Sequence, residues 1–109
     1  MTEYNPDCWV MLKMTYREQV FYKVLGGWGG SYINGTSWRL NSGVEKCEYD
    51  IALDVWKFYG HSGSVYVCPV SSYGLRMSNA EAYEMMKKAH PDHVELLENC
   101  NWEEMDWTK

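Results

Sequence analysis

Short apolar and aromatic runs, each four to seven residues long, follow one another through the first two thirds of the chain. They are shorter than ordinary helices and rich in Val, Trp and Tyr, so they predict β-strands. The predicted strands are residues 8–14, 19–25, 37–40, 44–49, 55–59 and 65–68. The first two runs do not alternate cleanly between apolar and polar positions. That pattern is typical of strands covered on both faces, or of strands with aromatic side chains on a wet face.

Glycine-rich segments separate these runs. Asn34-Gly35 is one of the strongest two-residue hairpin signals, because both residues tolerate a positive φ. Residues 26–30 (GGWGG) predict a shaped loop around one tryptophan, and residues 60–64 (GHSGS) predict a compact turn. Residues 50–54 fit either a helical turn or a loop.

After Met77 the apolar spacing becomes helical. Residues 78–81 (SNAE) have the form of a capping box, in which the serine caps the first turn and the glutamate reaches back. The residues predicted to face inward are Ala82, Met85, Met86 and Ala89. Pro91 suits the first turn of a second short helix. The inward residues of that second helix would be Val94, Leu97 and Cys100.

These elements predict an α+β fold in a single domain spanning residues 1–109. We expect an antiparallel β-sheet of four to six strands within residues 8–70. One or two C-terminal helices, within residues 78–101, would pack on one face of that sheet. Residues 102–109 would form an acidic tail that contains two tryptophans.

Charge is distributed unevenly. Residues 78–109 hold eight acidic side chains against three lysines, which accounts for the whole net charge of −5. Since an acidic surface repels phosphate backbones, this argues against nucleic-acid binding. The four cysteines lack the C-x-x-C spacing of zinc and redox sites, so we expect reduced thiols packed as small hydrophobic groups, no metal and no cofactor. Without an evident signal peptide or membrane span, a cytoplasmic protein is expected.

Two hypotheses, a hydrolase site and a metal site, have little support from the sequence. His61 stands beside Ser62 and Ser64, but neighbouring residues of one turn rarely form a nucleophile–base pair, and no orienting acid is evident. A small hydrolase therefore ranks third among the functions considered. His90 and His93 could offer two metal ligands, although an acidic helix start is the simpler explanation. We assign no catalytic or metal-binding residue from the sequence.

A nucleotide-binding protein is the second interpretation. The backbone N–H groups of residues 26–30 and 60–64 could cradle phosphate, while Trp28, Tyr32 or Trp38 stacks on a base. Arg39 and Arg76 could meet the charge. No Walker or dinucleotide motif is present. The alternative for the first loop is a tight crossover in which Trp28 only caps the core.

A non-enzymatic protein-binding module is the first interpretation, since Trp, Tyr and Arg are enriched at interaction hot spots. Its candidate contact residues, shared with the nucleotide reading, are Trp28, Tyr32, Trp38, Arg39, His61, Ser62, Ser64 and Arg76. A second, acidic partner surface comprises Glu98, Glu103, Glu104, Asp106 and Trp107. The alternative is that both tail tryptophans fold back on the sheet. We expect this of Trp102 and expect Trp107 to meet a partner.

Four segments together resemble small uncharacterised proteins of tailed bacteriophages. They are residues 9–13 (WVMLK), 22–30 (YKVLGGWGG), 37–43 (SWRLNSG) and 60–66 (GHSGSVY). The resemblance covers about residues 9–76 and does not extend beyond Ser78. It implies an origin in an infected bacterium, where such a protein would act in the host cytoplasm. It also implies a host protein as partner, which the chain would inhibit or redirect, host defence included.

Overall fold

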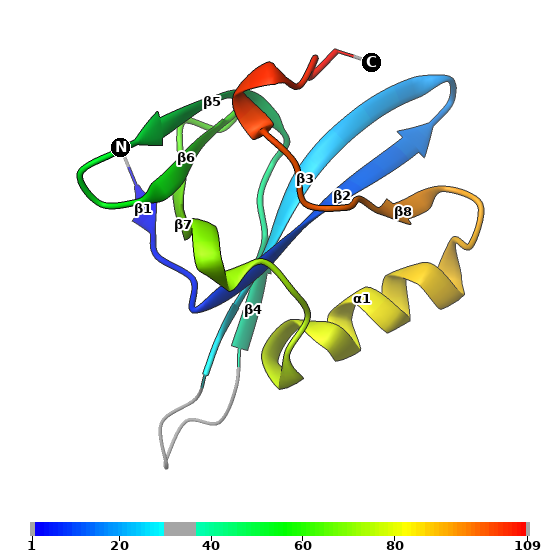
Figure 1. Ribbon diagram of the computed structural model, residues 1–109. Helices are drawn as coiled ribbons and strands as arrows, with labels where there is room; N and C mark the ends of the chain where they lie inside the picture. Colours follow the sequence, from blue (N-terminus) through cyan, green and yellow to red (C-terminus); the bar gives the residue numbers. More distant parts are fainter. Residues whose placement is uncertain (1, 30–36, 109) are drawn as a thin grey trace.

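The computed structural model describes residues 2–29 and 37–108, and shows an α+β protein with two four-stranded sheets and one α-helix (Figure 1). The strands are β1 (Glu3–Tyr4), β2 (Cys8–Tyr16), β3 (Gln19–Trp28), β4 (Ser37–Leu40), β5 (Val44–Asp50), β6 (Val55–Gly60), β7 (Val65–Pro69) and β8 (Val94–Leu96). The helices are α1 (Met77–Ala89) and two 3-10 turns, η1 (Val70–Ser72) and η2 (Trp102–Glu104). The hairpin turn predicted at Asn34-Gly35 lies outside the described residues.

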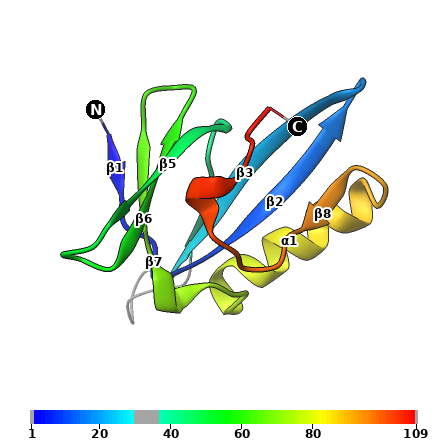
Figure 2. The same ribbon diagram turned by 45° about the horizontal axis from the view of Figure 1, so that its top comes forward.

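One sheet has the strand order β1-β7-β6-β5 and the other β4-β3-β2-β8. All pairings within them are antiparallel except that of β1 with β7. The α+β class is confirmed, and six of these strands fall within residues 8–70 as expected. The expectation of one sheet is wrong, because the chain leaves the β2–β3 sheet after β4, and β5, β6 and β7 form a second sheet together with β1 (Figure 2).

The second sheet is required by the apolar character of both faces of β2. Its residues from Cys8 to Leu12 are each at most 1% exposed. Trp9 and Met11 point into a core shared with the β5–β7 sheet, whereas Val10 and Leu12 pack in a second core with Ala82 of α1. The β2–β3 sheet is therefore the middle of three layers, and a single-sheet fold would leave one of its faces in water.

Trp102 belongs to the first core, so the predicted tail is part of the fold. Its side chain is fully buried, with ring centroids 6.0 Å from Trp9 and 6.3 Å from Phe58. Its indole N–H donates to Oδ1 of Asn99 at 3.0 Å. Trp107 is half-buried and stacks on Trp102 at 6.4 Å between centroids. Both tail tryptophans thus fold back on the chain's own core, as the alternative proposed.

The N-cap of helix α1 lies two residues before the predicted cap, Ser78. Its N-cap is Arg76, whose backbone N–H donates to Oδ1 of Asn79 at 2.8 Å. This is one half of a capping box, displaced from the predicted frame. Ser78 is instead buried within the first turn, with its Oγ 3.3 Å from Sγ of Cys8. This close contact between α1 and β2 determines the residue at which the helix begins.

The buried face of α1 differs in part from the predicted one. Ala82 is buried and Met86 is partly buried against the second core, as expected. Met85 is 54% exposed and Ala89 is also exposed, which corrects the prediction for these two residues. Because the helix starts at Met77, its inward face includes Ser78 and Asn79, which are both buried.

The predicted second helix is wrong, because Val94–Leu96 pairs as β8 with the open edge of β2. A short apolar run fits the periodicity of either a helix or a strand. Here the free edge of β2 pairs with it as a strand. The ammonium group of Lys87 shapes the connection by donating to the carbonyl oxygens of Pro91 and Val94, each at 2.7 Å. Val94 is buried and Leu97 is partly buried, but Cys100 is exposed.

Within residues 2–29 and 37–108, no helix has the length and apolar character needed to cross a membrane.

Gly27 lies in β3, not in the predicted loop, and permits α1 to approach the sheet. A Cβ at this position would stand 2.2 Å from Oγ of Ser78 and 3.0 Å from Sγ of Cys8. We therefore predict that Gly27→Ala lowers the free energy of unfolding by about 1–3 kcal/mol, measured by urea denaturation. Gly29→Ala is the matched control and should change stability little, because its new Cβ would stand 3.4 Å from Oδ2 of Asp7, its nearest neighbour in the described part of the chain. Equal effects of the two substitutions would contradict the packing argument.

Trp102→Ala should lower the free energy of unfolding by about 3–5 kcal/mol, because it opens a large cavity in the first core. Trp38→Ala removes a side chain that is 44% exposed and should cost far less. Thermal and urea denaturation of the two variants provide the measurement. A Trp102 variant as stable as the wild type would mean that the tail is not part of the core.

Candidate functional site

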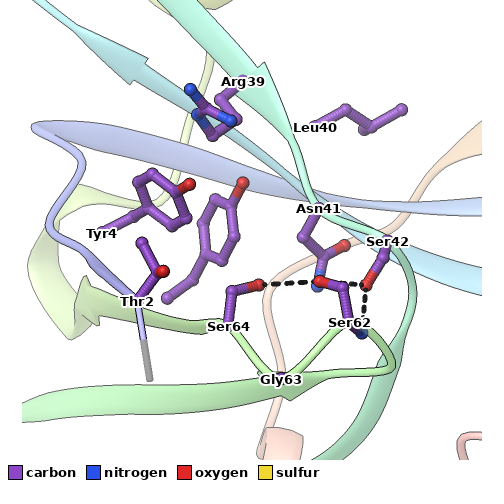
Figure 3. Close-up of a pocket in the computed structure, with 10 residues that line it drawn as sticks. Thr2, Tyr4, Arg39, Leu40, Asn41, Ser42, Ser62, Gly63 and Ser64 are labelled. Carbon is purple, nitrogen blue, oxygen red and sulfur yellow. Dashed lines mark hydrogen bonds between the residues drawn. The ribbon is translucent and has the colours of Figure 1, made fainter.

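Five of the predicted site residues gather around two adjoining hollows. The first, here called the arginine pocket, has a volume of about 390 Å³ (Figure 3). It is lined by Thr2, Tyr4, Arg39, Leu40, Asn41, Ser42, Ser62, Gly63, Ser64 and Tyr66. It lies where β1, the end of β4 and the turn between β6 and β7 meet. The two sheets therefore both contribute to it.

Three serines form a hydrogen-bonded row along this pocket (Figure 3). Ser42 Oγ donates to Ser62 Oγ at 3.1 Å and accepts the backbone N–H of Ser62 at 3.0 Å. Ser62 Oγ lies 3.3 Å from Ser64 Oγ. The turn of residues 60–64 thus presents hydroxyl groups to the pocket, where the sequence suggested backbone N–H groups.

Among residues 2–29 and 37–108, Arg39 is the only charged residue that lines the arginine pocket. Its guanidinium lies over the ring of Tyr4, 4.5 Å from the ring centroid. Among the described residues no carboxylate forms a salt bridge with it. Burial raises the pKa of Tyr66 to about 12, although the Arg39 charge acts in the opposite direction. At neutral pH Tyr66 is therefore a neutral phenol that can donate a hydrogen bond.

Asn41 is a buried polar side chain in the pocket wall, only 3% exposed. Its Oδ1 accepts the backbone N–H of Val24 at 2.8 Å, which fixes the side chain. Its Nδ2 has no hydrogen-bond partner within the described part of the chain. In Figure 3 this side chain extends towards the serine row. Sequence analysis missed Asn41, since an asparagine after a short strand reads as a turn residue.

The second hollow, here called the aromatic hollow, has a volume of about 440 Å³ and shares Tyr4 and Arg39 with the arginine pocket. It is lined by Glu3, Tyr4, Asn5, Trp28, Ser37, Trp38 and Arg39. Trp38 is 44% exposed, and the ring of Trp28 lies edge-on to Tyr4 at 6.5 Å between centroids. Trp28, Trp38, Arg39, Ser62 and Ser64 are therefore brought together from the predicted set.

The remaining predicted residues lie elsewhere. His61 Nδ1 is 2.7 Å from Oε1 of Glu45, and no hydrogen bond joins its ring to Ser62 or Ser64 among those found in the described residues. The arrangement sought for a small hydrolase is thus not formed at this turn. Arg76 lines a separate hollow near the start of α1. Tyr32 lies outside the described residues.

The turn between β5 and β6, here called the hairpin tip (residues 50–54), is the segment that the sequence left open between a helical turn and a loop, and it was not among the predicted binding residues. Ile51 is 83% exposed and Leu53 is 64% exposed. The Asp50 carboxylate accepts the N–H groups of Ala52 and Leu53 at 3.0 and 3.2 Å, and Asp54 has a φ of +54°. The available signal was a pair of aspartates four residues apart, enclosing apolar residues.

The hairpin tip is anchored by its own side chains. Tyr49 Oη donates to Oδ1 of Asp54 at 2.6 Å, across the turn. Lys57 Nζ lies 3.1 Å from Oδ2 of Asp50, and this contact lowers the pKa of Asp50. The backbone of the turn is therefore held while its apolar side chains project into water.

The predicted acidic surface adjoins the stem of this hairpin. Glu103 accepts the backbone N–H of Tyr49 at 2.9 Å, which covers part of the exposed edge of β5. Glu98 and Glu104 are exposed, and the Asp106 carboxylate accepts the N–H and Oγ1 of Thr108. Trp107 is half-buried and contacts Tyr22 and Phe58 as well as Trp102. Its ring is largely used within the fold.

The four cysteines are unpaired: Cys8 and Cys68 are buried, Cys47 is partly buried and Cys100 is exposed. Burial, followed by the carboxylates of Glu103 and Glu48, raises the pKa of Cys47 to about 12. The Cys47 thiol is therefore protonated and weakly nucleophilic at neutral pH. Within the described ranges, no cluster of three or more His, Cys, Asp or Glu side chains is placed to hold a metal ion.

In comparisons with protein-family models, curated proteins and solved structures, nothing matches this chain.

The buried thiols and phenols predict a loss of stability at alkaline pH. Burial raises the pKa of Tyr66 and Tyr73 from 10.0 to about 12, that of Cys47 from 9.0 to about 12, and that of Cys68 well above 9.0. As the pH rises above about 9, the unfolded chain releases these protons before the folded chain does, so the free energy of unfolding falls. The urea midpoint under reducing conditions should therefore decrease steadily from pH 9 towards pH 12. A constant or rising midpoint over this range would contradict the assignment.

Proposed function

We propose that this chain is a non-enzymatic protein-binding module whose main contact is the hairpin tip. The observation that carries the proposal is the exposure of Ile51 and Leu53 on a turn of fixed conformation. Exposed apolar side chains of this size are stabilised when a partner removes them from water. A two-residue apolar protrusion fits an apolar cavity on another protein.

The ordered backbone of the turn favours a binding role for its exposed apolar side chains over an exposure without function. Three interactions hold its backbone: the Asp50 carboxylate on two N–H groups, the Tyr49–Asp54 hydrogen bond and the Asp50–Lys57 ion pair. A contact surface that is already ordered loses little conformational entropy on association. The tip therefore presents its apolar side chains in a form ready for a partner.

Charge narrows the class of partner. The chain carries a net charge of −5, and the exposed side chain of Glu104 lies in the segment that packs on β5. A partner with basic residues around its apolar cavity would be attracted to this region, mainly through a faster association rate. The resemblance to small phage proteins supports a bacterial host protein, met in the host cytoplasm. Binding would inhibit or redirect that protein, and a host defence factor is one candidate.

The tip can be tested with the double substitution Ile51→Ser and Leu53→Ser. It should abolish capture of the partner from bacterial lysate and leave the melting temperature nearly unchanged, because both side chains are exposed in the free protein. Met77→Ser is the matched control, since Met77 is 85% exposed on a different element. Captured proteins would be compared by quantitative mass spectrometry. A capture profile identical for the double variant and the wild type would contradict the proposal.

A further inference from the structure

We propose that the arginine pocket and the aromatic hollow together bind a small ligand carrying a phosphate group and a flat aromatic ring, the chemistry of a nucleoside monophosphate. The phosphate would lie in the arginine pocket and the ring in the aromatic hollow. The two hollows share Tyr4 and Arg39 in their linings, so they lie next to each other, and the proposed ligand would pass along this stacked pair. Volumes of about 390 and 440 Å³ fall in the range of small-molecule sites.

The arginine pocket has the composition of a phosphate site. Arg39 supplies a positive charge that no described carboxylate neutralises by a salt bridge, in a chain whose overall charge is negative. A guanidinium is suited to phosphate because its N–H groups donate in a fixed fork. The hydroxyls of Ser62 and Ser64 line the same pocket and can rotate to donate to phosphate oxygens.

Asn41 gives independent evidence that the pocket is built for an acceptor. Its side chain is 97% buried, yet its Nδ2 donor has no partner in the described part of the chain. A buried donor left unsatisfied costs free energy, so a native structure rarely retains one without a reason. The bond from Val24 N–H to Oδ1 determines which end of the amide remains available. The Nδ2 atom is itself enclosed, so an oxyanion in the pocket would supply the missing acceptor once the wall beside Asn41 moves aside.

The aromatic hollow determines the orientation of the ligand. Trp28 and Trp38 offer rings on which a flat heterocycle can stack. Glu3 lines this hollow too, with its Oε1 accepting from Asn5 Nδ2 at 3.4 Å. A carboxylate repels a second phosphate but accepts a hydrogen bond from an amino group on a base. The phosphate is therefore placed beside the serines and the base beside the tryptophans.

This site is separate from the proposed protein contact. The turn of residues 60–64 and the hairpin tip lie at opposite ends of β6 (Figure 2). The Ile51→Ser and Leu53→Ser variant should therefore bind the small ligand as the wild type does. Failure of one proposal leaves the other intact.

Isothermal titration calorimetry with four probes tests the ligand class. Adenosine monophosphate should bind with a Kd below about 1 mM. Ribose 5-phosphate and adenosine, which each lack one half of the ligand, should bind at least about fivefold more weakly, and inorganic phosphate more weakly still. The absence of binding by adenosine monophosphate at millimolar concentrations would overturn the proposal. Equal affinity for inorganic phosphate and adenosine monophosphate would overturn the role of the aromatic hollow.

Four substitutions then locate the site. Arg39→Gln should weaken adenosine monophosphate binding about tenfold, as expected for loss of a charge-assisted hydrogen bond. Arg17→Gln is the matched control, because Arg17 also lies over a tyrosine ring, 5.2 Å from the Tyr16 centroid, but away from both hollows. Trp38→Ala should weaken adenosine monophosphate about fivefold and leave ribose 5-phosphate unchanged. Equal losses in the two arginine variants would show non-specific attraction and overturn the site.

Asn41→Asp is the fourth substitution and examines the buried donor directly. It keeps an oxygen for the Val24 N–H, removes the Nδ2 donor and adds a negative charge, so binding of adenosine monophosphate should fall about tenfold or more. Circular dichroism would establish that this variant is folded. If it does not fold, Ser64→Ala takes its place and should weaken binding about threefold. Unchanged affinity in the folded variant would overturn the role of Asn41.

Discussion

The strand β2 cannot be stable in water on either face, and most of the architecture follows from this constraint. Trp9 shows how specific the covering is. Its indole N–H donates to the carbonyl oxygen of Pro69 at 2.8 Å, and its ring lies 4.6 Å from Tyr73 and 5.2 Å from Phe58 between centroids. The β5–β7 sheet and the segment through Trp102 cover one face, and α1 covers the other. Each layer is held in place by contacts with the same strand.

Tyr73 joins these layers through its hydroxyl group. Its Oη accepts the backbone N–H of Met11 at 3.1 Å and donates to the carbonyl oxygen of Leu97. Because Met11 lies on β2 and Leu97 follows β8, one phenol ties the middle sheet to the segment that leads into η2. The ring itself packs against Trp9 and Trp102. Aromatic residues with a polar group at one end suit this position, because they are buried at one end and hydrogen-bonded at the other.

The sequence predicted the α+β class and the strands well, since apolar runs bounded by turn residues carry a strong local signal. It failed where the outcome depended on distant partners. The apolar spacing of residues 94–96 fits a helix or a strand, and they form a strand because they pair with the open edge of β2. The cap at Ser78 satisfied a local motif, but contact with Cys8 moved the helix start. Of the candidate site, the sequence supplied Arg39 and the serines of the 60–64 turn. It could not supply Asn41, because the lack of a partner for its Nδ2 among the described residues is visible only once its surroundings are known.

The position of Trp102 in the core has a consequence for how the protein is made. The ring fills space between Trp9 and Phe58, residues that leave the ribosome long before it does. Until residue 102 has been synthesised and has passed the exit tunnel, the first core lacks one of its largest side chains and the two sheets have no complete packing between them. Domains generally fold as units, and contacts between residues far apart in sequence form slowly. The two sheets can therefore complete their packing only after Trp102 has joined the residues that precede it, so the first core forms together with the segment through Trp102.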